Sequence, residues 1–172
     1  MKKAFLKDLL IKIFERGISI LAFIFPFTET AYYFGPKVFT GTDNLALKLF
    51  YFNYITKLTR FYEANVYLIF IFMVGIFIAC SRGTIPLRKY VRFNIIQAVL
   101  LNIICSCVGA CFCYTPIVVR ESTLGFLIAN SMFLGMVVII GYSSLLITYG
   151  RYPIIPVISE AARLQVQRGY LD

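Results

Sequence analysis

A basic turn leads directly into a long apolar run between Ser81 and Gly109, and this junction limits what the chain can become more than any other stretch. The turn, residues 81–90 together with the first residues of the run, carries Arg82, Arg88, Lys89 and Arg92. Lys and Arg beside an apolar segment of membrane length set the orientation of membrane proteins. The junction therefore predicts a membrane-spanning helix that begins at a basic turn.

The composition agrees with a membrane protein. Of the 172 residues, 60% are hydrophobic, whereas about 45 to 50% is usual in soluble domains. The excess of 17 Lys and Arg over 8 Asp and Glu could suggest nucleic-acid binding, but these cations lie mostly in short segments beside apolar runs. That arrangement is typical of membrane orientation, so we expect no nucleic-acid partner. The chain has no His, which excludes histidine-based catalysis, and we expect neither an enzyme nor a cofactor.

Hydropathy divides the chain into four candidate spans, at residues 18–34, 64–80, 91–115 and 122–149. The segments outside these spans are a basic amphipathic helix at 1–16, an amphipathic loop helix at 43–63, the basic turn and a tail at 150–172. Asp43 is the expected N-cap of the loop helix. The predicted fold class is all-α, a single multi-pass membrane domain with four transmembrane helices and additional interfacial helices.

The basic residues predict which ends share a side of the membrane. With four spans, the N-terminal helix, the basic turn and the tail lie together and hold about twelve Lys and Arg, against about five in the other two loops. Both termini are therefore expected on the side where the protein is synthesised.

Four polar side chains inside the predicted spans are the candidate functional residues: Glu29, Asn94, Gln97 and Asn102. Glu29 either lies at the membrane interface or faces the bundle interior or a wet cavity. The three amides either line a path for a passing molecule or bond to neighbouring helices. The opposite side of their helix, which includes Ile96 and Val99, is expected to face lipid.

The basic turn also has two interpretations. Its four cations either contact anionic lipid headgroups while setting topology, or form a docking face for a partner protein.

The five cysteines are Cys80, Cys105, Cys107, Cys111 and Cys113. The C-x-C pairs superficially resemble a thiolate metal or redox site. In a helix, however, Cys105 and Cys107 point about 200° apart. We therefore expect small side chains that fill a membrane helix, and no metal.

Three short islands of sequence carry a resemblance to a known family. They are Pro26, Glu29 and Thr30 in PFTET; Arg92, Phe93, Asn94, Leu100 and Leu101 in VRFNIIQAVLLNI; and Ile155, Pro156, Ala161 and Ala162 in IPVISEAARLQV. With these islands in this order, the chain resembles the twenty-kilodalton subunit family of the translocon at the inner envelope of chloroplasts.

The resemblance implies four membrane helices with both termini in the stroma, in the plastid inner envelope membrane. It implies a core subunit of the import translocon, within a hetero-oligomeric complex, that lines the preprotein path or only scaffolds it. The implied partners are other translocon subunits, a preprotein in transit and membrane lipids. A small-solute transporter or ion channel is the alternative. The apparent lack of a transit peptide and the wealth of residues with A/T-rich codons suggest a plastid gene.

Overall fold

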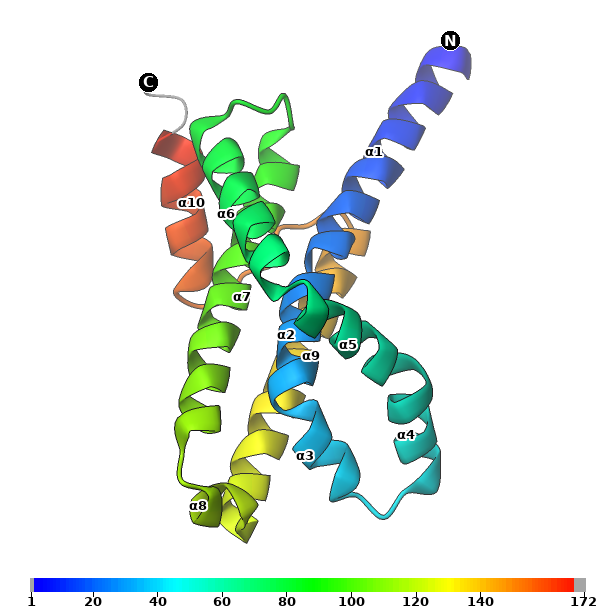
Figure 1. Cartoon of the computed structure of the whole chain (residues 1–172). Helices are drawn as coiled ribbons and strands as arrows, with labels where there is room; N and C mark the ends of the chain where they lie inside the picture. Colours follow the sequence, from blue (N-terminus) through cyan, green and yellow to red (C-terminus); the bar gives the residue numbers. More distant parts are fainter. Residues whose placement is uncertain (1, 169–172) are drawn as a thin grey trace.

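The computed structural model describes residues 2–168, and this part of the chain is a bundle of helices without a β-strand (Figure 1). The all-α prediction is confirmed. In chain order the elements are α1 (Lys2–Ala22), α2 (Ile24–Tyr33), α3 (Gly35–Thr40), α4 (Leu45–Phe50), the π-helix η1 (Tyr51–Ile55), α5 (Thr56–Ala64), α6 (Val66–Arg82), α7 (Lys89–Tyr114), α8 (Ile117–Glu121), α9 (Thr123–Thr148) and α10 (Ile158–Arg168).

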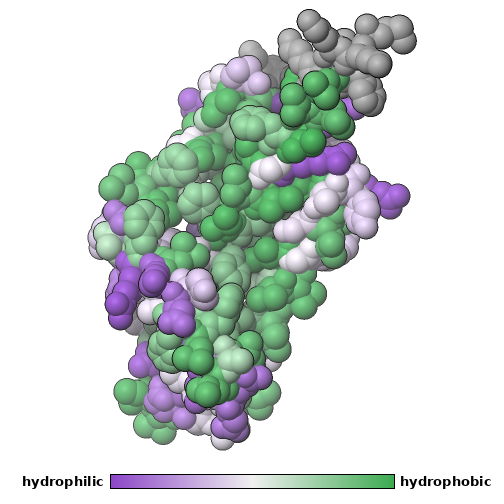
Figure 2. All heavy atoms as spheres, turned by 90° about the vertical axis from the view of Figure 1, so that its right-hand side faces the viewer, coloured by the Kyte–Doolittle hydropathy of each residue, from purple (hydrophilic) through white to green (hydrophobic). Residues whose placement is uncertain are grey.

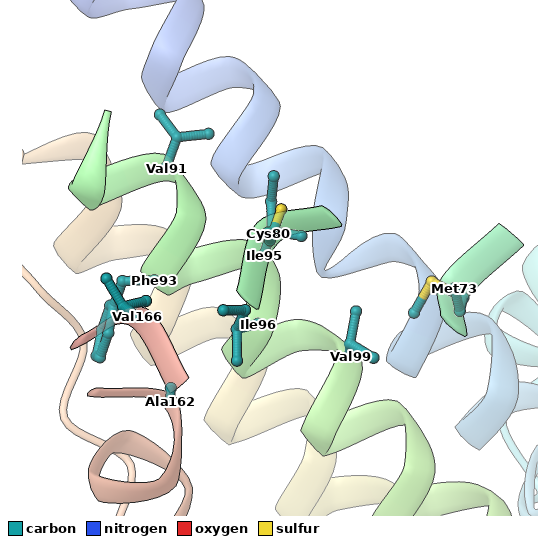
Figure 3. Packing of buried hydrophobic residues seen from close by; sticks show 9 residues of the cluster. All are labelled: Met73, Cys80, Val91, Phe93, Ile95, Ile96, Val99, Ala162 and Val166. Atoms are coloured by element: carbon teal, nitrogen blue, oxygen red, sulfur yellow. The ribbon is translucent and has the colours of Figure 1, made fainter. Parts of the chain in front are cut away.

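Helix α7 is the centre of the bundle. Every residue from Val91 to Val99 is buried, because α1, α2, α6 and α10 pack around this half of the helix. Figure 3 shows the packing: Met73 and Cys80 of α6 and Ala162 and Val166 of α10 lie around α7. The expectation that Ile96 and Val99 face lipid is therefore wrong, since these side chains are 0% and 3% exposed. Helix α7 exposes large apolar residues only after Asn102, at Ile103, Ile104 and Tyr114.

The N-terminal helix is longer than the sequence analysis predicts. Helix α1 continues through Gly17 and ends at Ala22, so the basic amphipathic residues and the start of the first predicted span share one helix axis. The chain breaks at Phe23, whose backbone N–H bonds to the carbonyl of Ile20. Pro26 follows and has no N–H to donate back to the preceding turn, which explains why the break lies here.

The loop between α3 and α6 is an arm made of α4, η1 and α5. Asn44, rather than the expected Asp43, caps α4, because its side chain accepts hydrogen bonds from the backbone N–H groups of Ala46 and Leu47. The chain bends by 81° between the arm and α6, at a break near Asn65. Tyr51 and Ile55 pack inward, whereas the large apolar side chains at 47, 50, 54, 58 and 61 are exposed.

Among residues 2–168, two helices, α7 and α9, are each long and apolar enough to cross a membrane, and the bent pair of the arm and α6 makes a third if it is counted as one span. The start of α1 and the α6–α7 turn lie at one end of the bundle, and α8 and the α3–α4 connection lie at the other (Figure 1). Figure 2 shows a face that is mostly hydrophobic. The structure is that of a helical membrane protein; four spans and their orientation stay predictions.

Candidate functional site

Glu29 lies inside the bundle, at the contact between α2 and α7. Glu29 is only 2% exposed. The Ser106 hydroxyl donates a hydrogen bond to the side-chain oxygen Oε1 of Glu29. Its other oxygen, Oε2, is buried without a hydrogen-bond partner in the described part of the chain. Ser106 precedes the end of α7 by about 12 Å at about 1.5 Å per residue. Glu29 thus faces the bundle interior, in the half of α7 that lies away from the basic turn.

The sequence around Glu29 shapes a short, tightly packed helix. The hydroxyls of Thr28 and Thr30 donate to the carbonyls four residues earlier, Ile24 and Pro26. These internal bonds satisfy both hydroxyls in an apolar environment. The Thr30 hydroxyl also lies 3.5 Å from the Cys105 sulfur, so this face of α2 is pressed against α7.

Asn102 lies one turn before Ser106 on α7 and is 8% exposed. Its backbone carbonyl lies 3.1 Å from the Ser106 hydroxyl, whose single proton is shared between this carbonyl and Glu29. The side-chain Oδ1 of Asn102 has no hydrogen-bond partner among residues 2–168. We call Glu29, Ser106 and Asn102 the polar seam. It combines a buried carboxyl group with two uncommitted acceptor oxygens.

Gln97 and Asn94 do not belong to the polar seam. The Gln97 amide donates to the Pro153 carbonyl at 3.1 Å and to the Ser159 hydroxyl at 2.5 Å. Gln97 therefore holds the tail against α7. Asn94 is 0% exposed and lies one turn closer to the basic turn. The four polar residues of the sequence analysis thus divide into two groups, with only Glu29 and Asn102 in the seam.

Gly109 is a site residue that the sequence analysis did not identify. A Cβ atom there would lie 2.2 Å from the Tyr33 ring, so only glycine lets α2 approach α7 this closely. Tyr33 follows Glu29 by one helical turn. A glycine in the middle of an otherwise well-formed membrane helix is the signal for such a contact.

Tyr33 also lines a vestibule of about 430 Å³ at the end of the bundle opposite the basic turn. Its other lining residues are Tyr32, Pro36, Lys37, Thr40, Phe112, Cys113, Arg120 and Glu121. The Lys37 ammonium lies 2.6 Å from the Glu121 carboxylate, and this hydrogen bond and charge hold the pKa of Glu121 below its ordinary value. Tyr33 thus lines the vestibule from the same helix, α2, that carries Glu29 of the polar seam.

The basic turn holds exposed and buried cations. Arg82, Arg88 and Lys89 are exposed, and the Arg88 Nε atom lies 3.0 Å from Oε1 of Glu15 on α1. Arg92 differs, because it is 2% exposed. Its guanidinium donates to the carbonyls of Cys80 and Ser81, at 2.7 and 3.2 Å. Arg92 thus caps the end of α6 and, buried as it is, is not placed to contact headgroups or a docked partner.

The cysteines lie on different faces, as their spacing predicts. Cys105 is 4% exposed, whereas Cys107 is exposed. Within residues 2–168, no three or more His, Cys, Asp or Glu side chains are grouped in a way that could hold a metal ion.

Comparison with known proteins identifies the family of this chain. The sequence matches the family described as "Chloroplast import apparatus Tic20-like" over residues 12–162. The chain belongs to the Tic20 family. The matched range includes the polar seam, the vestibule and the basic turn of this Tic20 chain, and it confirms the resemblance drawn from the three islands.

Relatives in algae and in a cyanobacterium cover most of the chain. The Tic20 family protein Ycf60 of Gracilaria tenuistipitata var. liui is 32% identical over 159 residues, which are 91% of this chain and 77% of that protein. Ycf60 of Pyropia yezoensis is 34% identical over 157 residues, which are 90% of this chain and 76% of that protein. A Tic20 family protein of Synechocystis is 29% identical over 154 residues, which are 89% of this chain and 93% of that protein.

Proposed function

We propose that this chain is a core membrane subunit of the translocon that imports proteins across the plastid inner envelope membrane. The observation that carries the proposal is the match to an import-apparatus family over residues 12–162, which covers nearly all of the helical bundle. The named Ycf60 relatives in red algae support a gene carried by the plastid itself. We propose no catalytic role.

The polar seam and the vestibule are the part of the bundle that we propose to line the preprotein path. Glu29 and Asn102 each keep a side-chain oxygen without a hydrogen-bond partner among the described residues. A polypeptide in transit presents backbone N–H groups, which such oxygens can accept weakly and release. A path with few strong sites suits transport better than a tight binding site.

A path for a polypeptide requires more than this chain. The vestibule, at about 430 Å³, falls within the range of about 300 to 1,000 Å³ that is usual for small-molecule pockets. We therefore propose that other translocon subunits complete the path, in a hetero-oligomeric complex. Gln97 has a scaffolding role in this proposal, because its amide already holds the tail.

We place the termini and the basic turn in the stroma. Arg82, Arg88 and Lys89 then face the headgroup layer, whereas Arg92 caps α6.

A small-solute transporter or ion channel is less well supported. Such a protein needs a paired ionisable site within its spans. The hydrogen bond that Glu29 accepts comes from the Ser106 hydroxyl, which is neutral.

Crosslinking to an arrested preprotein tests the path. In a variant with all five cysteines replaced, single cysteines at Thr40 on the vestibule rim and at Asn102 in the seam are compared with one at Leu127, which is 62% exposed on α9. We expect preprotein crosslinks at Thr40 and Asn102 and none at Leu127. Crosslinks only to other subunits at all three positions would leave a scaffolding role and refute path lining.

Depletion of the chain from plastids tests the wider proposal. Import of precursors into the stroma should fall, whereas uptake of small solutes should not. The reverse pattern would favour a transporter.

A further inference from the structure

A second pocket lies at the end of the bundle that carries the basic turn, between the start of α7, the segment after α9, and α10. It has a volume of about 290 Å³ and is lined by Lys89, Phe93, Tyr152, Arg163, Val166 and Gln167. Lys89 is the first residue of α7, and Arg163 lies in the second turn of α10. Two cations from distant parts of the chain therefore meet at one cavity.

The wall of this pocket is apolar and rigidly held. Phe93 and Val166 are 4% and 8% exposed and belong to the main core around α7. The Tyr152 ring packs edge-on against Phe93 and Tyr90, with ring centroids 5.3 and 5.1 Å apart. Edge-to-face pairs of this kind are favourable and help to hold the ring in place. The pocket is thus a preformed feature of the bundle.

Helix α10 is also fixed in place, so Arg163 is not on a loose tail. At its start, the Ser159 hydroxyl accepts a hydrogen bond from Gln97 of α7. Near its end, Gln165 accepts a hydrogen bond from the Ser81 hydroxyl at 2.9 Å. Both contacts join α10 to the helices around the pocket, as its place beside α6 and α7 in Figure 1 indicates.

The lining indicates an amphiphilic anion. Two cations and the Gln167 amide suit a phosphate or sulfonate group, whereas Phe93 and Val166 suit hydrocarbon. The outer surface nearby continues this pattern, since Ile154 and Leu164 are 61% and 62% exposed. A soluble anion would not use the apolar wall. The pocket also lies where α7, a candidate membrane span, begins, which is the level of the headgroups.

We propose that this pocket binds the phosphate or sulfonate headgroup of an anionic membrane lipid. The bound lipid joins α7 to α10 and so holds the tail against the bundle. This site is distinct from the polar seam, and it does not depend on the role in protein import.

Fluorescence quenching tests the site directly, because the chain contains no Trp. Tyr152→Trp places a single reporter in the pocket wall of the full-length protein. The variant is reconstituted in phosphatidylcholine vesicles with a small, fixed fraction of either brominated phosphatidylglycerol or brominated phosphatidylcholine. We expect stronger quenching by the phosphatidylglycerol. Equal quenching by the two lipids would overturn the proposal.

Charge variants distinguish the pocket from a diffuse basic surface. In the reporter background, Lys89→Gln and Arg163→Gln should each weaken the preference for phosphatidylglycerol about fivefold, and Arg163→Lys should largely keep it. Arg82→Gln is the matched control, because Arg82 is exposed at the same end but does not line the pocket. An equal loss with Arg82→Gln would refute a specific site.

Adding excess inorganic phosphate at constant ionic strength shows whether the pocket binds a lipid headgroup or a soluble anion. It should leave the quenching unchanged if the pocket takes a lipid. Reversal of the quenching by phosphate would show a site for soluble anions and refute the lipid assignment. Circular dichroism of each variant confirms that the helices are retained, and Lys89→Gln keeps the test decisive if Arg163→Gln does not fold.

Discussion

Single residues decide how closely the helices of this bundle approach one another. At Gly109 the Tyr33 ring occupies the space that a side chain would need. At Gln97 one amide joins the middle of the chain to the segment after α9. Both residues lie on α7, and both act through a contact with a residue far away in the sequence.

Gly109→Ala should destabilise the bundle by about 1 to 3 kcal/mol, because the added methyl group overpacks the contact with Tyr33. Gly135→Ala is the matched control, since a Cβ there meets no described heavy atom within 4 Å. That control should be neutral or slightly stabilising, because Ala favours helix. Unfolding of the purified protein in mixed detergent micelles measures both. Equal effects of the two variants would contradict the role of Tyr33, and adding Tyr33→Ala to Gly109→Ala should restore part of the loss.

Gln97→Leu should loosen the tail, because the Ser159 hydroxyl and the Pro153 carbonyl lose their amide donor. The expected cost is about 0.6 to 2 kcal/mol. Limited trypsin digestion after Arg163 should become faster by a corresponding factor. Asn53→Leu, which changes an exposed amide on the arm, should leave this cleavage rate unchanged. An unchanged rate in Gln97→Leu would show that other contacts of α10 suffice.

At the scale of elements, helix ends rather than helix middles determine the shape. The carbonyl groups at the end of a helix lack partners within the helix. In α6 the buried Arg92 supplies two donors to these carbonyls, from the neighbouring helix α7. Gly83, with φ of 71°, then reverses the chain in the left-handed conformation that glycine tolerates best. The basic turn therefore holds the end of α6 against α7, in addition to carrying exposed positive charge.

Arg92→Gln should fray the last turn of α6. Hydrogen bonds from a charged group contribute about 1.5 to 3 kcal/mol, so local opening should rise by about tenfold or more. Cys80 reports the change, because it is 1% exposed in the intact helix. With the other four cysteines replaced, maleimide labelling of Cys80 should accelerate in Arg92→Gln and not in Arg82→Gln. Equal labelling rates would mean that Arg92 is not the cap that keeps the turn closed.

At the scale of the whole molecule, the distribution of charge and the arrangement of the helices both distinguish the same two ends of the bundle. The start of α1 and the α6–α7 turn lie at one end, and α8 and the α3–α4 connection lie at the other (Figure 1). The first end also carries most of the basic residues. Helices α1 and α2 form a broken helix pair that includes the buried Glu29, and we predict that this pair crosses the membrane.

Labelling with a membrane-impermeant maleimide decides the number of crossings. Single cysteines at Lys12, Thr42 and Thr84 are placed in the cysteine-free protein, at the start of the chain, between α3 and α4, and between α6 and α7. We expect Lys12 and Thr84 to be labelled from one side and Thr42 from the other, which requires two crossings before Thr84 and, together with the candidate spans α7 and α9, four in all. If Lys12 and Thr42 share a side, α1 and α2 do not cross.

Several features were predictable because they depend on local sequence. The membrane helix that begins at the basic turn follows from its length and hydropathy, and it is α7. The opposite orientations of Cys105 and Cys107 follow from helical periodicity alone. The cap of α4 was predicted one residue too early, at Asp43 instead of Asn44, because both residue types favour caps equally.

The sequence by itself determined an all-helical membrane protein, the position of its central helix and the family to which it belongs, because apolar length, charge distribution and short motifs are properties of neighbouring residues. Only the tertiary structure decided the use of the polar residues on that helix. Glu29 meets Ser106, Gln97 meets Pro153 and Arg92 meets Cys80 through contacts between helices. Periodicity shows which side of a helix is polar, but it does not show which neighbour covers that side.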